Sequence, residues 1–453
     1  MKHFNFFPVF YETFIYLPVK RDKMRKDIIK SLIALKQNEI PFDVINRDVK
    51  LPINRKKIIT VPGVRRCGKS TLMEIAINSL VEGGGVPADH ILWLGFDDER
   101  LVNMKANELD EVITSYMEMY PDTPVKDVHM FFDEIQLISG WEYFVLRVYK
   151  SYCKNVFVCG SNATMLSTEL ASALRGYPLE YVTYPLSFNE YCRFKGVNTS
   201  SFLEQDRAKV RNAFLSYCCD DSSYPEVVLT RSKSEQIKLL HGYFDTMILK
   251  DLAEHYSISN IAMLRYFIKR IMANLTKPTS INAIYNDIRS QGFKVSKDNM
   301  YYACDIFMFI RIPKYNRSLA KVQKSLDKYY CIDNGLRSVV LMPQSDDSGK
   351  KLENVIFLEL NRRYAADDSI FYYQGTDECD FVLQRGDTVS ELIQVTWDMS
   401  DYDTRQREVA GLIEASEVTG CDKLTIITVD EETTINETDK TIHVIPAWKW
   451  LLQ

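Results

Sequence analysis

The chain has 453 residues, of which 46% are hydrophobic and 26% are charged. This balance is typical of globular proteins, excludes a fibrous or wholly disordered chain, and at this length favours roughly two to four domains. The formal net charge of -5 argues against a dedicated nucleic-acid-binding protein, and the ten cysteines show no C-x-x-C spacing. We therefore expect reduced thiols in a cytoplasmic protein, with neither a zinc site nor a disulfide framework.

Residues 1–23 are apolar enough to be weighed as a signal peptide. Pro8 and Glu12 interrupt this stretch and no small-residue cleavage site follows, so the sequence disfavours that reading. No later stretch reaches the ~18 uninterrupted apolar residues that a membrane span needs, and we expect no membrane partner. Met24 stays open as an alternative translation start.

The pattern G-x-x-x-x-G-K-[ST] follows a short β-branched run at 56–62 and precedes an amphipathic helical pattern at 70–80. In this order, backbone N–H groups at the helix N-terminus face phosphates, Lys69 reaches the β and γ phosphates, and the Ser70 hydroxyl binds Mg²⁺. We therefore predict ATP and Mg²⁺ as ligands. The predicted nucleotide-binding residues are Gly63, Arg65, Arg66, Cys67, Gly68, Lys69, Ser70 and Thr71.

Two further apolar runs end in polar residues. Residues 128–134 predict a buried strand that delivers Asp133 and Glu134 at its C-terminal edge, where open α/β sheets bind ligands. Asp133 would hold Mg²⁺ through water, and Glu134 would act as the general base on the attacking water. A third strand candidate, at 155–166, leads to Asn162, which we expect between the Mg²⁺ site and the water, with Ser161 as the alternative.

With these elements in order, the chain resembles the AAA-superfamily ATPases of bacteria and archaea that carry a long C-terminal domain of undefined function. The segments that carry the resemblance are GVRRCGKSTL, FFDEIQLISGWE, CGSNATML, LRGYPLEYVTYPLSFNEY, YPEVV, ILKDL, KYYCIDNGLR, LENVIFLEL, ECDFVL, LIQVTWD and TRQRE. The resemblance implies an α/β chain with a P-loop NTPase (AAA/RecA-like) parallel-sheet core, a helical lid, a winged helix and a C-terminal PD-(D/E)XK-like α/β domain.

The resemblance also implies domain boundaries. We expect an N-terminal helical segment (1–45), the ATPase core (46–195), the helical lid (196–259), the winged-helix module (260–345) and the restriction-endonuclease-like domain (346–453). The chain departs from the family twice. The arginine expected after Gly176 is Tyr177, so Arg175 would stand in as the catalytic arginine, and Ser222 and Ser223 replace a glycine pair.

Residues 260–345 carry 14 Lys and Arg, five Asp and no Glu, a local charge of +9 that leaves -14 for the rest of the chain. Helical patterns at 264–275, 281–291 and 299–312 follow one another, and residues 328–336 would supply wing strands. Helix-turn-helix geometry would place the helix beginning near Lys297 against a DNA groove. The predicted phosphate contacts are Lys294, Lys297, Arg311, Lys314, Arg317, Lys321, Lys324 and Lys328. Such modules serve equally in protein interaction, so both readings stay open.

After the hydrophilic residues 344–351, a predicted helix at 352–364 carries Glu353, and strands are predicted at 378–383 and 391–398. The nuclease resemblance implies a Mg²⁺ site with an acid on the first strand and E-x-K on the second. Asp380 meets the first requirement, but Gln394 and Thr396 stand at the positions of the acid and the lysine.

The possible nuclease-like site is therefore Glu353, Asp380 and Gln394. A glutamine oxygen is a weak ligand for a hard cation and threonine supplies no charge, so this set predicts a nuclease-like fold without cleavage. Glu391 could be recruited, although its spacing does not fit the pattern.

The sequence predicts an ATP-hydrolysing AAA-type protein that couples its nucleotide state to engagement of DNA. One alternative is a nucleotide-dependent protein-interaction switch or scaffold, and another is an ATP-regulated, Mg²⁺-dependent nuclease in defence. A homo-oligomer is compatible with the resemblance, because AAA-type sites often take an arginine from a neighbouring subunit.

Overall fold

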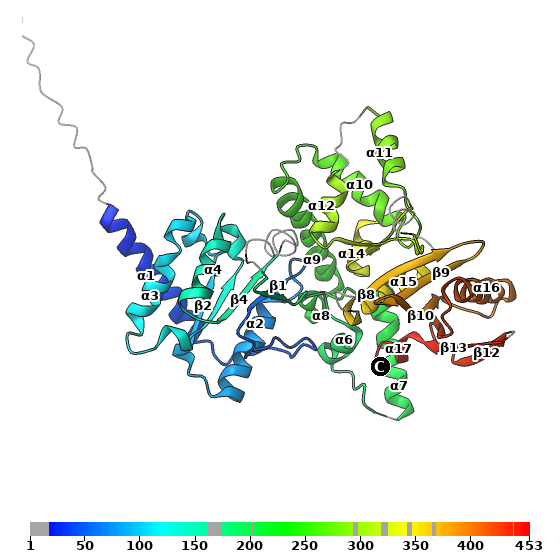
Figure 1. The fold of residues 1–453 in the computed structure, drawn as a ribbon, viewed down its shortest axis with the longest axis horizontal. Coiled ribbons are helices and arrows are strands. Elements are labelled where there is room, and N and C mark those ends of the chain that lie inside the picture. Colours follow the sequence, from blue (N-terminus) through cyan, green and yellow to red (C-terminus); the bar gives the residue numbers. More distant parts are fainter. Residues whose placement is uncertain are drawn as a thin grey trace, which may run out of the picture.

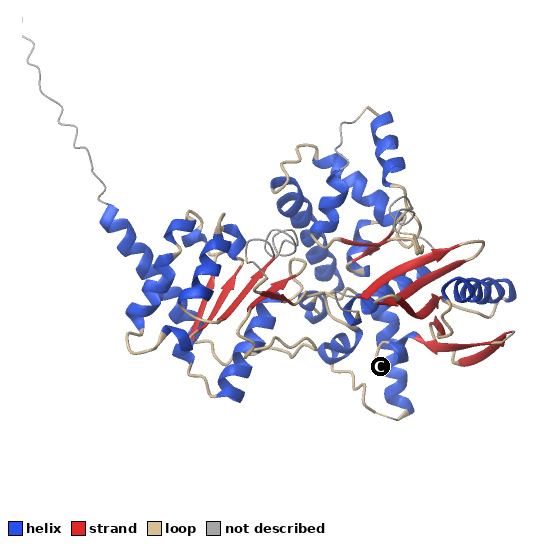
Figure 2. Ribbon diagram, in the orientation of Figure 1, coloured by secondary structure: helices blue, strands red, loops and turns tan. Residues whose placement is uncertain are grey.

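The computed structural model describes residues 18–161, 174, 176–201, 203–292, 298–318, 325–341, 347–364, 368–437 and 439–453. The described elements form an N-terminal part built on one sheet, a largely helical middle, and a C-terminal part built on a second sheet (Figure 1). Helices lie against both larger sheets (Figure 2). Within the described ranges, each helix is too short or too polar to cross a membrane.

The N-terminal sheet has five strands in the order β2-β3-β4-β1-β5, and all neighbouring strands run parallel. Its central strands are short apolar runs buried on both faces, as parallel sheets require. The helices and strands of this part are α1 (Pro18–Gln37), β1 (Ile58–Pro62), α2 (Lys69–Asn78), β2 (Ile91–Gly95), α3 (Asp110–Met119), β3 (His129–Asp133), α4 (Trp141–Ser151), β4 (Asn155–Gly160), β5 (Pro178–Glu180) and α6 (Phe188–Lys195).

The strand order brings three predicted motifs to one edge of this sheet. Strand β4 lies between β1 and β3, and the parallel direction makes the residues that follow all three strands emerge together. The strands predicted at 56–62 and 128–134 are confirmed as β1 and β3, and the helix predicted at 70–80 is α2. The candidate at 155–166 is confirmed as strand over 155–160, where β4 ends. Helices α1, α3 and α4 share a core with one face of the sheet, and α2 packs on the other.

The middle of the chain is mainly helical. Its elements are α7 (Glu204–Leu215), the π-helical turn η7 (Ser216–Asp220), α8 (Pro225–Leu229), α9 (Lys233–Thr246), the π-helical segment η8 (Met247–Glu254), α10 (Ile261–Ala273), α11 (Ile281–Ser290), α12 (Asp298–Asp305), β6 (Phe309–Ile312), β7 (Lys328–Cys331) and α14 (Asn334–Val340). The helices predicted at 264–275 and 281–291 are confirmed as α10 and α11.

The predicted continuation of the third helix to residue 312 is wrong. Helix α12 ends at Asp305, and residues 309–312 form β6, which pairs antiparallel with β7. Phe309 and Ile312 are buried in the core while Arg311 between them is exposed. Cross-strand bonds to β7 therefore replace the helical bonds that the apolar pattern suggested.

The C-terminal part is built on a six-stranded sheet in the order β12-β13-β11-β10-β9-β8. Its elements are α15 (Ser348–Arg363), β8 (Asp368–Gln374), β9 (Glu378–Arg385), β10 (Thr388–Val395), α16 (Tyr402–Thr419), β11 (Leu424–Thr428), β12 (Thr433–Glu437), β13 (Lys440–Pro446) and α17 (Ala447–Trp450). Alternating residues of β9 face opposite sides, because Phe381 packs with α15 whereas Val382 packs with α16.

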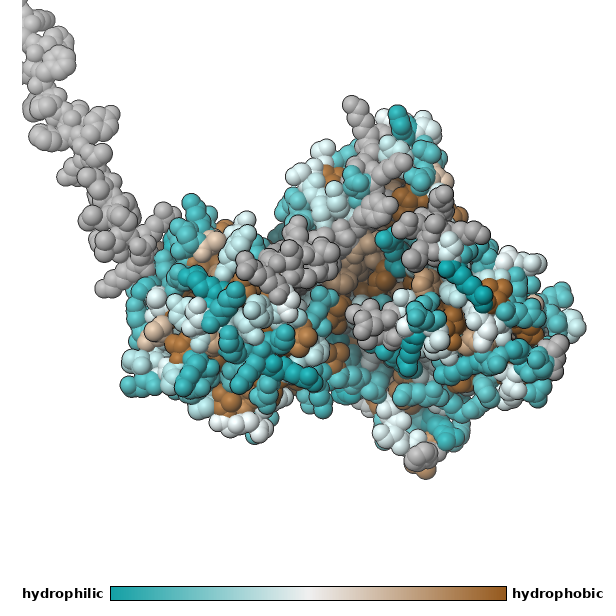
Figure 3. Space-filling view, viewed as in Figure 1, coloured by the Kyte–Doolittle hydropathy of each residue, from teal (hydrophilic) through white to brown (hydrophobic). Residues whose placement is uncertain are grey.

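One buried cluster connects the three parts. It begins at Val64 and Cys67 beside the predicted phosphate loop, runs through α9, η8 and α10, and reaches α15 and α17. The face seen in Figure 3 is mostly hydrophilic, and hydrophobic side chains gather in the recess near the centre of the molecule. The helical middle is thus held to both flanking parts by shared apolar packing.

Candidate functional site

The loop after β1 has the backbone that a phosphate cradle needs. Gly68 precedes α2 with a left-handed φ of 99°, and an added Cβ would lie 3.0 Å from Arg47 Nη1. A Cβ on Gly63 would lie 2.2 Å from the Thr183 carbonyl oxygen. The first-turn N–H groups of α2 have no acceptor within the helix, so they are suited to phosphate oxygens.

Lys69 opens α2, and its side chain is 5% exposed. Its Nζ donates to the Val64 carbonyl at 3.2 Å and lies 3.8 Å from Glu134 Oε1. Burial alone would lower the pKa of Lys69, but nearby negative groups, including the Glu134 and Asp133 carboxylates, raise it above its usual value. The ammonium therefore stays charged at the wall of the cleft, as contact with phosphate requires.

Asp133 ends β3 and is buried. Its carboxyl group accepts hydrogen bonds from the Cys159 thiol and the Ser70 hydroxyl. Burial raises the pKa of Asp133, and those two hydrogen bonds offset only part of this effect. A hydroxyl beside a carboxyl group is a donor set that suits Mg²⁺, so Ser70 and Asp133 fit the predicted metal role.

Glu134 has a left-handed backbone with φ 50°, an unusual conformation for a residue with a side chain. Its Oε2 accepts a hydrogen bond from Ser161 Oγ at 3.1 Å, and a second one from the Gln136 amide. Ser161 follows β4, so the strand between β1 and β3 delivers a polar group to the acidic pair. The sequence predicts Asn162, or Ser161 as the alternative, between the Mg²⁺ site and the water. Ser161 contacts Glu134 of the acidic pair, and Asn162 lies outside the described residues.

Most of these groups line a cleft of about 1310 Å³, although Gly63 and Ser161 are not among its lining residues. One wall holds the predicted residues Arg65, Arg66, Gly68, Lys69, Ser70 and Thr71, together with Asp133 and Glu134. The opposite wall is built by α8, α9 and η8, with Pro225, Glu226, Leu229, Lys238, Tyr243 and Lys250 among its residues. The cleft thus lies between the sheet of the N-terminal part and the helical middle.

Cys67, also predicted to bind nucleotide, does not line the cleft. Its side chain is fully buried, and its Sγ donates to the Thr183 carbonyl at 3.2 Å. The predicted contact with nucleotide is therefore restricted to its backbone, and the thiol supports the loop from behind.

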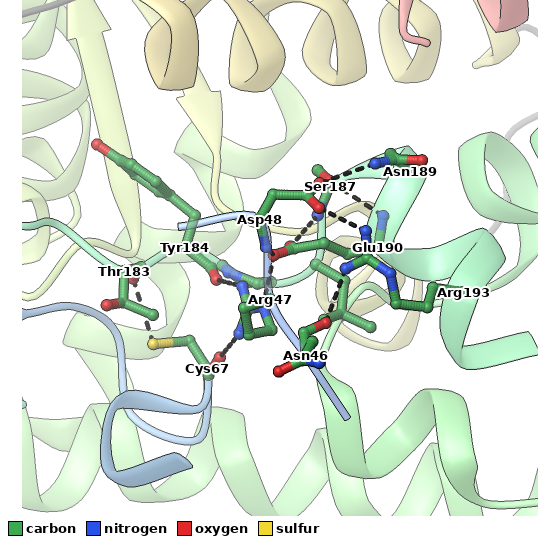
Figure 4. Close-up of polar contacts among 12 residues, drawn as sticks. Asn46, Arg47, Asp48, Cys67, Thr183, Tyr184, Ser187, Asn189, Glu190 and Arg193 are labelled. Carbon is green, nitrogen blue, oxygen red and sulfur yellow. Dashed lines mark hydrogen bonds and ion pairs between the residues drawn. The ribbon is translucent and has the colours of Figure 1, made fainter. Parts of the chain in front are cut away.

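Arg47 supports the same loop and was not predicted (Figure 4). Its guanidinium donates to the Cys67 carbonyl at 2.9 Å, to the Tyr184 carbonyl at 2.9 Å and to Glu190 Oε1 at 2.7 Å. Glu190 also closes a capping box with Ser187 at the start of α6. The S-x-x-E pattern at 187–190 signals that helix start, but no pattern in the sequence connects it to residue 47.

The two arginines of the loop reach across the cleft. Arg65 forms a forked pair with Asp251 of η8, with bonds of 2.7 Å and 3.2 Å. Burial would lower the pKa of Arg65, but the bonds and charge of Asp251 raise it. Arg66 lies 3.7 Å from Glu226, and its guanidinium is 5.9 Å from the centre of the Tyr243 ring. Asp251 and Glu226 are partners that the sequence analysis missed.

The predicted DNA contacts are only partly described. Lys294, Lys297, Lys321 and Lys324 lie outside the described residues. Arg175, predicted as the catalytic arginine, also lies outside them. Lys314 is half-buried, and its backbone forms an isolated parallel β-bridge with Tyr372 of β8. Exposed Arg317 donates to the Val418 carbonyl at the end of α16, and Arg311 pairs with Asp327 at 3.1 Å.

The prediction that Lys328 contacts phosphate is wrong. Its side chain is 0% exposed and its Nζ lies 3.1 Å from Glu353 Oε1 and 3.0 Å from Asp380 Oδ1. Burial would lower the pKa of Lys328, but the surrounding carboxylates raise it well above its usual value. The lysine is therefore a buried cation. It pairs with acids that are far from it in the sequence.

The predicted nuclease-like residues do come together. Gln394 Oε1 accepts a hydrogen bond from the Asp380 backbone N–H at 3.0 Å, and Glu353 lies on α15 beside them. Burial raises the pKa of Glu353, and the neighbouring Asp380 adds to that increase. Glu391 is not recruited, because its carboxylate binds Lys423 at 2.7 Å and Thr425 at 2.9 Å.

Comparison with known families matches residues 55–192 to an AAA domain and residues 221–347 to a domain of unknown function. The chain is 30% identical over 427 residues to the uncharacterized protein MJ1544 of Methanocaldococcus jannaschii, covering 90% of this chain and 91% of that protein. An uncharacterized protein of Haemophilus influenzae is 28% identical over 350 residues, covering 76% of this chain and 83% of that protein.

Solved structures give weaker likenesses. The Aeropyrum pernix Orc1 protein in complex with DNA shows a TM-score of 0.28 at 10% identity, covering 70% of this chain and 91% of that chain. Cdc6p from Pyrobaculum aerophilum shows a TM-score of 0.24 at 11% identity, covering 72% of this chain and 95% of that chain. Similarities at this level carry no argument about fold or function.

The phosphate loop, the acidic pair after β3 and the five-stranded parallel sheet agree with the AAA match, which implies nucleotide binding. The relationship to MJ1544 extends over almost the whole of both chains. The chain is therefore a P-loop protein of the AAA superfamily, and it belongs to the same family as MJ1544 of Methanocaldococcus jannaschii.

Proposed function

We propose that the protein hydrolyses ATP in the cleft, and that its nucleotide state changes how the N-terminal part is held to the helical middle. The observation that carries this proposal is the position of Arg65 and Arg66. Both line the cleft on the P-loop side and face carboxylates of the opposite wall, Asp251 and Glu226. Phosphates in the cleft would compete for the same guanidinium groups, so binding is linked to the contact between the two walls.

Each predicted side chain has a role that its geometry supports. Lys69 presents a buried positive charge to the phosphates, and the N–H groups at the start of α2 bind their oxygens. Ser70 and Asp133 would hold Mg²⁺, which neutralises the charge on the phosphoryl group being transferred. Glu134 accepts a proton from the attacking water, and Ser161 holds its carboxylate in place.

Two substitutions test the ATPase proposal. Lys69→Ala removes a charged donor to phosphate, and we expect ATP binding to weaken by about 10-fold or more. Glu134→Gln keeps the shape but not the base, so we expect binding within a few-fold of wild type and a turnover about 10² to 10⁴ times slower. A fluorescent ATP analogue measures binding, and phosphate release measures turnover.

Lys126→Ala is the control, because this lysine lies before β3, outside the cleft lining. It should bind and hydrolyse ATP like wild type. Wild-type turnover in Glu134→Gln would refute the role given to that carboxylate, and undiminished ATP binding in Lys69→Ala would refute the nucleotide site itself.

We propose DNA as a partner of the middle of the chain, because residues 260–345 carry a local charge of +9. The order of three helices and two antiparallel strands, α10, α11, α12, β6 and β7, supports a winged-helix reading. Two observations limit the number of phosphate contacts, since Lys328 is buried and Arg311 is paired with Asp327. The alternative is a switch in which the same surface binds another protein.

A further inference from the structure

Strand β7 inserts a lysine into a cluster of acids from the C-terminal part. Lys328 Nζ lies 3.1 Å from Glu353 of α15 and 3.0 Å from Asp380 of β9, and it also pairs with Glu378 of β9. Tyr330, two residues along β7, donates its hydroxyl to Glu353 Oε1 at 2.8 Å. One short strand thus supplies both donors to a pocket whose acids belong to another part of the chain.

The polar groups of the cluster find their hydrogen-bond and ion-pair partners within the chain. An ammonium group has three donors, and Lys328 faces three carboxylates. The second Asp380 oxygen accepts from the Val395 N–H at 3.0 Å. The Gln394 oxygen is taken by the Asp380 N–H and its amide donates to Glu408, so the polar groups around Asp380 are already bonded within the protein.

A divalent metal does not fit this arrangement. The nuclease resemblance implies Mg²⁺ between Glu353, Asp380 and the residue at 394, but Lys328 Nζ lies against both acids. A metal would have to displace a buried ammonium from two of its three carboxylates, Glu353 and Asp380, which is strongly unfavourable. Over the residues that the structure describes, no group of three or more His, Cys, Asp or Glu side chains is arranged to hold a metal ion.

The same strand pair is joined to the C-terminal sheet by backbone bonds. Tyr372 of β8 donates its N–H to the Pro313 carbonyl at 3.2 Å and accepts from the Tyr315 N–H at 2.6 Å. The Tyr372 hydroxyl donates to the Leu326 carbonyl at 2.7 Å. The residues flanking β6 and β7 therefore rest on β8, and the Lys328 cluster lies at the interior of that contact.

We propose that Lys328 is the permanent cation of the Glu353–Glu378–Asp380 cluster, replacing a divalent metal, and that the cluster locks the β6–β7 strand pair onto the C-terminal part. The pocket that the resemblance assigns to a nuclease-like site is, in this proposal, a contact that joins two parts of the chain. The inference does not depend on the ATPase proposal, because it uses no residue of the P-loop cleft.

Amine labelling of the native full-length wild type tests the lock without any substitution. Sulfo-NHS-acetate should modify the exposed Lys423 rapidly and leave Lys328 unmodified, with and without millimolar MnCl₂, as read by peptide mass spectrometry. Modification of Lys328 at a rate similar to that of Lys423 would overturn the proposal, and so would Mn²⁺-induced exposure of Lys328.

Metal titration of the nucleotide-free full chain tests the replacement. Mn²⁺ binding, followed by loss of the free-ion electron paramagnetic resonance signal, should be the same for wild type and Asp380→Asn. An additional equivalent of Mn²⁺ on wild type that Asp380→Asn lacks would show that the cluster is a metal site and would refute the proposal.

Substitution of the lysine tests the energetic role. Lys328→Met should lower Tm by about 5 °C or more, because it leaves buried carboxylates without a counter-charge. Adding Asp380→Asn to Lys328→Met should restore part of the loss, and Lys423→Met, at a 66% exposed ion pair, should change Tm little. A Lys328→Met protein as stable as wild type would contradict the lock, and failure of Lys328→Met to fold would support it only if the double variant folds.

Discussion

At the scale of single residues, the P-loop is held from behind by one arginine. Arg47 and Glu190 are both almost fully buried, with side-chain exposures of 4% and 3%. The guanidinium uses its planar fork for one carboxylate and two backbone carbonyls, which a lysine could not reproduce. Glu190 in turn accepts from the Asp48 and Ser187 N–H groups. The conformation of the loop therefore depends on a side chain outside the loop.

Arg47→Met should destabilise the protein by about 3–5 kcal/mol, because it leaves Glu190 buried without a counter-charge. The free energy of unfolding in urea measures this loss. Arg47→Lys should recover only part of it, because the bonds to the Cys67 and Tyr184 carbonyls are not restored.

Arg193→Met provides the matched control in the same cluster. Arg193 pairs with Asp48, but the two side chains are 37% and 40% exposed, so we expect a change of about 1 kcal/mol or less. Equal effects of the two substitutions would contradict the supporting role of Arg47.

At the scale of elements, η8 is the partner of the P-loop. Its Asp251 lies 186 residues after Arg65 in the sequence, yet the two form a forked pair between the P-loop and the helical middle. The segment begins directly after α9, which lines the opposite wall with Tyr243 and Lys238. We propose that a change at the phosphates would reach the helical middle through the Arg65–Asp251 pair, with the Arg66–Glu226 pair beside it.

Asp251→Asn should strengthen ATP binding by about three- to ten-fold, because Arg65 no longer has to leave a carboxylate to meet phosphate. Titration of a fluorescent ATP analogue measures the change. In the same variant, the bonds between the cleft walls are weakened, so proteolysis between α6 and α10 should be faster without nucleotide.

Asp245→Asn is the control for this prediction. Asp245 belongs to α9 and pairs with Arg265 at 2.7 Å, outside the cleft lining. It should leave ATP affinity unchanged. Affinity in Asp251→Asn that is equal to or weaker than wild type would show that Arg65 does not exchange Asp251 for phosphate.

At the scale of the whole molecule, charge is distributed unevenly. Residues 260–345 have a local charge of +9 within a chain of net charge -5. Fewer of these basic side chains are available at the surface than the sequence count suggests. Lys328 is buried, Arg311 pairs with Asp327, and Arg270 pairs with Asp287. A DNA partner would therefore be held by fewer phosphate contacts than the sequence count suggests.

If the middle binds DNA through two to four phosphates, affinity for a duplex should fall roughly 10- to 100-fold between 50 and 200 mM salt. Fluorescence anisotropy with a labelled duplex measures this slope. In the double variant Lys314→Gln/Arg317→Gln, the salt dependence should be weaker and should correspond to about one to two fewer phosphate contacts.

Lys423→Gln, which alters an exposed lysine at the C-terminal sheet, should leave the slope unchanged. An absence of binding to duplex, single strand or RNA at low salt would remove DNA as a partner and favour the protein-interaction switch. That result would leave the ATPase proposal intact.

Much of the nucleotide site could be predicted because its information is local. Strand, glycine loop and helix occupy consecutive residues, and Asp133 and Glu134 terminate an apolar run whose length and composition specify a buried strand. The parallel sheet then brings both motifs to one edge by general rules of α/β folds. The prediction of a helix to residue 312 was wrong because a short apolar run fits the repeat of a helix and that of a strand equally well. Pairing with β7 makes residues 309–312 a strand.

The sequence by itself determined the P-loop motif, the acidic pair and most helices and strands, because each of these depends on neighbouring residues. The order of the motifs along the chain indicated the superfamily. Only the tertiary structure decided the partners of Arg47, Arg65 and Lys328. The sequence separations from these residues to Glu190, Asp251 and Asp380 are 143, 186 and 52 residues. A charged residue is usually solvated at the surface, but its identity alone does not exclude a buried ion pair. Which of the two it adopts depends on whether the fold places an opposite charge beside it.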